Sequence, residues 1–146
     1  MVEGFAHPAT CLVVFSKAPL QGKVKTRLIP HLGDEAATGL HKQLLHQTIS
    51  MATSSNLAPV ELWCNPDSCH AQFQLLRERH GVALHDQQGA KLGERMQHAA
   101  ANVLARTEQV LIIGSDCPAM TKAYLQSAVQ ALQSGSEVVI GPAEDG

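Results

Sequence analysis

The chain alternates short, wholly apolar runs with longer stretches of helical periodicity, and this alternation limits the folds open to it. The apolar runs predict strands at residues 11–15, 60–64, 82–85, 109–113 and 137–140. Strands without a polar face are typical of sheets that are covered on both sides. Strands that are separated by helices form serial βαβ units. We therefore expect an α/β fold, with a mostly parallel sheet and helices on both faces.

Four stretches between the apolar runs carry apolar residues at helical spacing. They predict helices at residues 35–54, 67–80, 92–106 and 121–134. Thr121 is expected to cap the last helix, and Asp67 or Ser68 the second. The sequence shows no repeat or long linker, and its 146 residues suit one domain.

Composition and charge limit the kinds of partner that the protein can be expected to bind. Aromatic residues make up only 3% of the chain, too few for a base-stacking nucleic-acid platform. The net charge of −2 argues against a nucleic-acid or membrane surface as the main partner. No apolar run reaches the length of a membrane span, and the N-terminal residues lack the features of a signal peptide. We expect a cytoplasmic protein.

The cysteines and histidines form no recognisable metal motif. Cys64 and Cys69 lack the second pair of ligands that a zinc site requires, so we expect free thiols. His41 and His46 are five residues apart and do not share a helix face well. We interpret both histidines as surface or incidental residues.

The segment after the first predicted strand is strongly basic. No acidic residue occurs from position 4 to 33. Four of the eleven Lys and Arg residues lie within residues 17–27, called the basic segment from here on: Lys17, Lys23, Lys25 and Arg27. Ligands of open α/β sheets bind beyond the carboxyl ends of the strands, so this segment is suited to a polyphosphate. Arg27 could grip a phosphate with two hydrogen bonds, whereas lysines act as point charges. The alternative is a solvated basic loop.

The same loop lacks the standard phosphate motifs. Lys17 and Val24 occupy positions where a Walker A loop needs Gly and Ser or Thr. The chain has no G-x-G-x-x-G turn either, which disfavours NAD. Pro19 and Gly22 would instead shape the turn, and Gly22 would allow a ligand close to the backbone.

Acidic residues follow two later strands. Asp116, in the run Gly114-Ser115-Asp116-Cys117-Pro118, suits Mg²⁺ (or Mn²⁺) when substrate phosphates supply the other oxygens. The alternative is a turn or helix-cap aspartate. Glu144 and Asp145 follow the last strand, and Asp145 could complete the metal site or act as a base. A polar turn is the alternative there.

The start of the third predicted helix has a further candidate contact. Gly89, Leu92 and Gly93 would let a flat ligand such as a nucleotide base approach the backbone. We expect Gly93 to take part in nucleotide binding. Glu94 suits the positive N-terminus of this helix, which is a sufficient structural reason for it.

Four ordered motifs point to a known family. They are F-S-K-A-P-L-Q-G-K-V-K-T-R-L, L-G-E-R-M, I-G-S-D-C-P and V-V-I-G-P-A-E-D-G. Together they resemble the bacterial transferase family associated with radical-SAM/selenodomain proteins, in the glycosyltransferase-A-like (GT-A-like), nucleotide-diphospho-sugar transferase superfamily. The resemblance implies a GT-A-like three-layer sandwich with the basic loop on the nucleotide phosphates. The D-C-P motif is similar to the metal-binding acidic motif of that superfamily, which carries over to Asp116.

The residues and the resemblance lead to one main functional hypothesis. We expect an Mg²⁺-dependent transferase that uses a nucleotide-diphospho-sugar or related nucleotide and a small-molecule acceptor, with Asp116 and Asp145 as catalytic candidates. The alternatives are a nucleotidyltransferase that releases pyrophosphate and a non-catalytic nucleotide-binding module. Members of the resembling family continue past E-D-G, so we expect residues 1–146 to lack the acceptor part. An apolar edge left open in this way could be covered by a homodimer.

Overall fold

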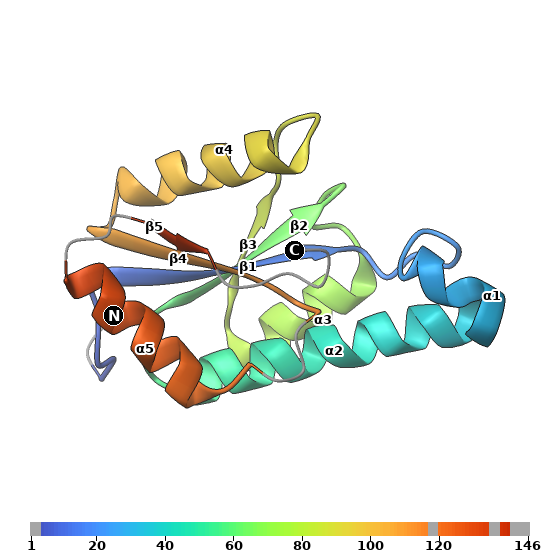
Figure 1. Cartoon of the computed structure of the whole chain (residues 1–146), viewed down its shortest axis with the longest axis horizontal. Helices are drawn as coiled ribbons and strands as arrows, with labels where there is room; N and C mark the ends of the chain where they lie inside the picture. Colours follow the sequence, from blue (N-terminus) through green and yellow to red (C-terminus); the bar gives the residue numbers. More distant parts are fainter. Residues whose placement is uncertain (1–3, 117–119, 135–137, 141–146) are drawn as a thin grey trace.

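The computed structural model describes residues 4–116, 120–134 and 138–140. Its strands form one parallel sheet in the order β3-β2-β1-β4-β5 (Figure 1). The strands are β1 (Thr10–Lys17), β2 (Val60–Asn65), β3 (Ala83–Asp86), β4 (Gln109–Gly114) and β5 (Val138–Ile140). The predicted parallel α/β sheet is confirmed.

Helices cover both faces of this sheet. The helices on the faces are α2 (Asp34–Ser54), α3 (Ala71–His80), α4 (Leu92–Leu104) and α5 (Lys122–Gln133). Two short turns, η1 (Thr26–Leu28) and α1 (Ile29–Leu32), precede α2 and lie beyond the end of the sheet (Figure 1). Helix α4 lies on one face, and α2, α3 and α5 lie on the other, so the molecule has three layers (Figure 1). Within the described ranges, no helix combines the length and apolarity needed to cross a bilayer.

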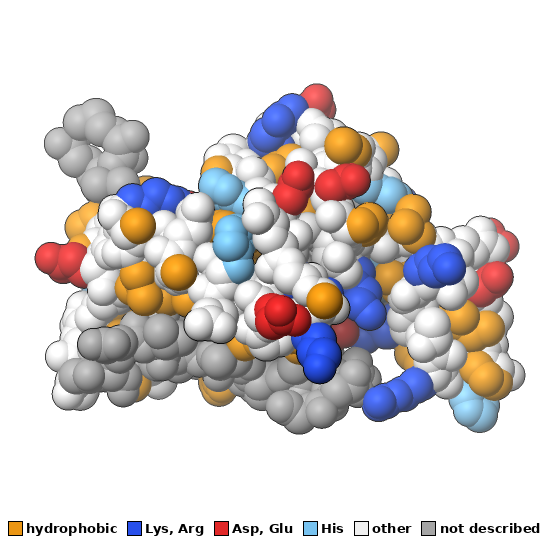
Figure 2. Space-filling view, turned by 90° about the horizontal axis from the view of Figure 1, so that it is seen from above, with side chains coloured by type: hydrophobic (Ala, Val, Ile, Leu, Met, Phe, Trp, Pro, Cys, Tyr) orange, Lys and Arg blue, Asp and Glu red, His pale blue; other side chains and the backbone are white. Residues whose placement is uncertain are grey.

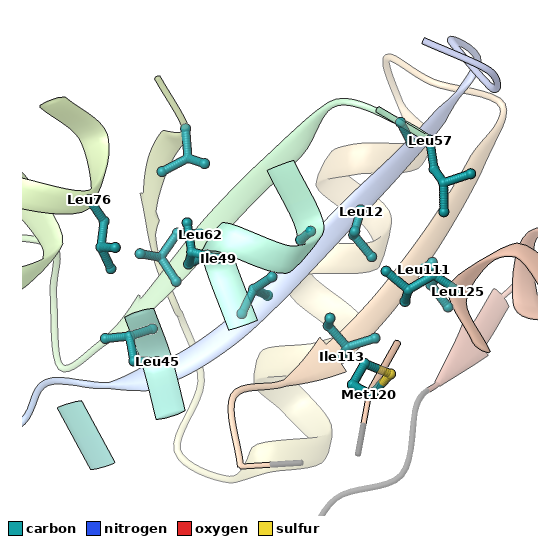
Figure 3. Packing of buried hydrophobic residues seen from close by; sticks show 14 of the residues in the cluster. Leu12, Leu45, Ile49, Leu57, Leu62, Leu76, Leu111, Ile113, Met120 and Leu125 are labelled. Carbon is teal, nitrogen blue, oxygen red and sulfur yellow. The ribbon is translucent and has the colours of Figure 1, made fainter. Parts of the chain in front are cut away.

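The central strand β1 explains why its sequence shows no polar face. Leu12 and Val14 pack into the larger core cluster with α2, α3 and α5, part of which Figure 3 shows. Cys11 and Val13 point the other way, into the cluster under α4. Because both faces of the strand are buried, every position in this run is apolar.

The helix caps agree with the sequence in one case and differ in another. Thr121 caps α5 as predicted. The prediction of Asp67 or Ser68 as the cap of α3 is wrong, because the helix begins later and His70 accepts the backbone N–H of Gln72. Asp67 instead accepts a backbone N–H within the preceding turn.

The strand order has a switch point between β1 and β4, and open α/β sheets typically have a crevice at such a point, beyond the carboxyl ends of the strands. From β1 the chain moves outward to β2 and β3, and it then returns to the opposite side of β1 as β4. The connections that follow β1 and β4 therefore diverge. Crevices of this kind, beyond the carboxyl ends of the strands, are where open α/β sheets bind ligands.

Candidate functional site

The carboxyl ends of β1 and β4 are held together by two serines. Phe15 of β1 lies opposite Gly114 of β4, and the next residue on each chain is a buried serine. The Ser115 hydroxyl donates to the Ser16 hydroxyl at 3.3 Å. This bond fixes the point where Asp116 leaves the sheet, so the aspartate lies at the mouth of the crevice.

The Asp116 carboxylate faces two nitrogen atoms. Its side chain is 38% exposed, and its Oδ1 lies 3.2 Å from Lys25 Nζ and 3.8 Å from His41 Nδ1. Oδ1 itself is buried and, in the part of the chain that the structure describes, accepts no hydrogen bond of normal geometry. The contact with Lys25 is therefore an ion pair by distance, and Oδ1 keeps the capacity to bind a cation.

His41 reaches this site from α2. The residue is buried, and its Nε2 donates to the backbone carbonyl of Lys17 at 2.8 Å. Burial lowers the pKa of His41, an effect larger than the opposing effects of the Lys17 carbonyl and the Asp116 charge. Because a carbonyl can only accept, Nε2 carries a proton, and Nδ1 is the ring nitrogen that faces Asp116.

Our interpretation of His41 as a surface residue is wrong. It belongs to the buried stripe of α2, with Ala37, Leu44, Leu45 and Thr48. The spacing of these residues follows the helical period, so the sequence did contain the signal. His46 is not one of the buried residues of α2, so the spacing between the two histidines does not reveal the position of His41.

The four cations of the basic segment differ in exposure: one side chain points inward and the other three lie at the surface. The Lys25 side chain is only 7% exposed. Lys17, Lys23 and Arg27 are exposed. Figure 2 shows Lys and Arg side chains around the hollow between the α1 end and the body of the molecule. The structure thus brings Lys25 together with Asp116, while Lys17, Lys23 and Arg27 lie at the surface.

The remaining predicted site residues are placed as follows. Pro19 is buried, and Gly22 has a φ of +80°, with open space where a Cβ would project. Gly93 is exposed in the first turn of α4. At Gly89, in contrast, φ is +134° and an added Cβ would come within 2.9 Å of the Glu94 side chain. Gly89, and not Gly93, is therefore the position near this helix that requires glycine. Asp145 lies outside the described residues.

The donors present fit a hard cation that is shared with a substrate. In the described ranges, no group of three or more His, Cys, Asp or Glu side chains is arranged to hold a metal ion. Among the buried side-chain oxygens of the described residues, Asp116 Oδ1 is the one without a hydrogen-bond partner. Mg²⁺ is commonly held by one or two carboxylates together with substrate phosphates and water, and a single aspartate is compatible with this pattern.

A solved structure closely resembles this fold. It is the crystal structure of a protein from Desulfovibrio desulfuricans G20 that is provisionally identified as a nucleotide-diphospho-sugar transferase. The match has a TM-score of 0.76 and 27% sequence identity, and covers 86% of this chain and 55% of that chain. The chain therefore spans about half the length of this similar protein. A search of curated proteins found no match.

Family membership is shown by a match over most of the sequence. Residues 48–146 match a family described as uncharacterized proteins conserved in bacteria. The matched region includes β2 to β5 and the Asp116 end of the crevice. This is more than half of the chain, and the chain thus belongs to the DUF2064 family.

Proposed function

We propose that this chain is the nucleotide-binding part of an Mg²⁺- or Mn²⁺-dependent transferase. Its substrate would be a nucleotide-diphospho-sugar or a related nucleotide, and the acceptor a small molecule. The observation that carries the proposal is the meeting of the basic segment with Asp116 at the crevice between β1 and β4. The similarity to a structure named for nucleotide-diphospho-sugar transfer supports it.

In this proposal, the site works by positioning and by charge. Lys17, Lys23 and Arg27 would neutralise the phosphates, and Asp116 would hold the cation. A bound Mg²⁺ would stabilise the negative charge that develops on the leaving phosphate. His41 would fix the end of β1 through its hydrogen bond to the Lys17 carbonyl, and so orient the start of the basic segment.

Two reactions are compatible with these groups, and their products distinguish them. The name of the similar structure favours glycosyl transfer, which would release a nucleoside diphosphate. The dense positive charge of the basic segment also suits a pyrophosphate leaving group, and hence nucleotidyl transfer. A non-catalytic module would release neither product and would bind nucleotide without a metal effect.

The direct test is the metal dependence of nucleotide binding in Asp116→Asn. We expect Mg²⁺ to tighten the binding of nucleoside diphosphate sugars to the parent in calorimetric titrations. Asn lacks the charge that a hard cation requires but matches Asp in shape, so the variant should keep its thermal stability and lose the Mg²⁺ effect.

Asp86→Asn is the matched control, since Asp86 is an exposed aspartate at the same edge of the sheet, on β3. Its acceptor oxygen, which receives the Ser68 N–H, is kept in Asn. This variant should retain the full Mg²⁺ effect. An equal Mg²⁺ effect in Asp116→Asn and parent would remove the metal role of Asp116. Absence of nucleotide binding by the parent would overturn the proposed function itself.

A further inference from the structure

The backbone of Lys25 is in a conformation that is unusual for lysine. Its φ and ψ are 51° and 40°, in the left-handed region that residues other than glycine seldom occupy. Its carbonyl accepts the backbone N–H of Leu28 as the chain turns into η1. Strain of this kind persists only where the surroundings enforce it, and it is concentrated at functional sites.

The strained backbone accompanies an inward side chain. The Lys25 side chain is 7% exposed, and its Nζ lies 3.2 Å from Asp116 Oδ1. This is the buried oxygen that accepts no hydrogen bond among the described residues. The ammonium group therefore occupies the place beside Oδ1 that a divalent cation would take. Two like charges so close together, in a site partly shielded from water, repel strongly, so the ammonium group weakens the binding of a divalent cation to that oxygen.

Asp116 also needs a counter-charge when no metal is bound. Lys25 Nζ is the nearer of the two nitrogen atoms, at 3.2 Å against 3.8 Å for His41 Nδ1. The Asp116 side chain is 38% exposed but its Oδ1 is buried, so an ammonium group alongside stabilises the charge on that oxygen. When a nucleotide binds, its phosphates bring negative charge into the site, and a cation is then needed next to the phosphates.

We propose that Lys25 is an exchangeable counter-ion of Asp116, which holds the carboxylate in the free protein and gives way to the divalent cation when the nucleotide binds. Nζ then moves from Oδ1 to the phosphate oxygens. This inference rests on the proposed function and adds to it a coupling between the binding of the cation and the binding of the nucleotide. The free protein binds the cation weakly, and cation and nucleotide bind tightly only together.

The test is Mn²⁺ binding without nucleotide, measured by electron paramagnetic resonance. Lys25→Met removes the ammonium group and keeps most of the side-chain stem. We expect it to bind Mn²⁺ at least tenfold more tightly than the parent, since the competing charge is gone. Adding Asp116→Asn to this variant should abolish the gain. Lys42→Met, which removes an exposed lysine of α2, should leave Mn²⁺ affinity unchanged.

A second variant guards against a folding defect. Lys25→Gly removes the same charge, and glycine adopts the left-handed backbone without strain. It should therefore fold at least as well and also bind Mn²⁺ more tightly. With a nucleoside diphosphate present, both variants should lose their advantage over the parent, because the phosphates have lost a cation.

The outcomes separate this inference from the proposed function. If folded Lys25→Met and Lys25→Gly bind Mn²⁺ no more tightly than the parent, the exchange is wrong, although Asp116 can still hold the metal. If Mn²⁺ fails to tighten nucleotide binding by the parent, the proposed function fails as well.

Discussion

Glu61 is a buried acid on β2 whose charge is balanced by its neighbours. Its carboxylate accepts hydrogen bonds from the Arg106 guanidinium and from Trp63 Nε1, and His85 Nε2 lies 3.3 Å away. Burial alone would raise the pKa of Glu61, but the hydrogen bonds from Arg106 and Trp63, together with the charges of His85 and Arg106, hold the pKa below its usual value. The ionised form is therefore stabilised by folding.

Arg106→Met should destabilise the protein in a pH-dependent way. At pH 7 we expect the free energy of unfolding to fall by about 1–3 kcal/mol, because a buried carboxylate loses charge-assisted hydrogen bonds. Arg106 is 42% exposed, and solvent screening favours the lower end of this range. Urea denaturation at a series of pH values from 7 to about 3 measures the effect.

The sign of the pH dependence follows from the lowered pKa of Glu61. Its contribution is complete above the unfolded value of 4.5 and is lost as the pH falls through the folded value. The gap between parent and Arg106→Met should therefore close in acid. Arg79→Met, at an exposed arginine of α3, should follow the parent at every pH. A gap of constant size would show that Glu61 does not depend on Arg106 for its charge.

At the scale of elements, the apolar strands and the long periodic helices were predictable, and the short helical turns were not. The apolar run at 11–15 became β1, and the stretch at 35–54 became α2 with a boundary one residue earlier. The turns η1 and α1 were missed, because three or four residues are too few to show a helical period. The turn η1 closes the basic segment and α1 follows it directly, so the conformation at this end of the segment could not be derived from the sequence.

Helix α2 links the core to the site, and its packing can be tested. Leu45 is fully buried between α2 and the sheet (Figure 3). Leu45→Ala should lower the free energy of unfolding by about 2–5 kcal/mol through lost burial and a residual cavity. Leu32→Ala makes the same chemical change at a half-exposed position of α1 and should lower it far less. Equal midpoint shifts in urea denaturation would contradict this packing.

At the scale of the whole molecule, the topology explains which part of the site could be foreseen. Parallel strands bring their carboxyl ends to one edge, so the sequence could place the basic segment and Asp116 near each other. The inward turn of Lys25 could not be foreseen, because it depends on a backbone conformation that lysine rarely adopts. His41 joins the site only through the packing of α2 on the sheet.

The charge of the whole molecule gives a last prediction, on salt. The net charge is −2, so the protein as a whole does not attract an anion, and nucleotide binding must depend on the local basic segment. We expect nucleotide affinity to fall steeply as ionic strength rises, because the exposed cations are screened. Arg27→Ala should weaken binding by about 2 kcal/mol at low salt, or roughly thirtyfold, through the loss of a charge-assisted contact.

The salt dependence itself identifies the groups responsible. Arg27→Ala should flatten the slope of affinity against salt, because fewer exposed cations then contact the phosphates. Arg79→Ala removes an exposed arginine of α3 and should leave both the affinity and the slope unchanged. Calorimetric titrations of a nucleoside diphosphate at several salt concentrations would measure both quantities. If the two variants behaved alike, the positive charge that binds the nucleotide would lie outside the basic segment.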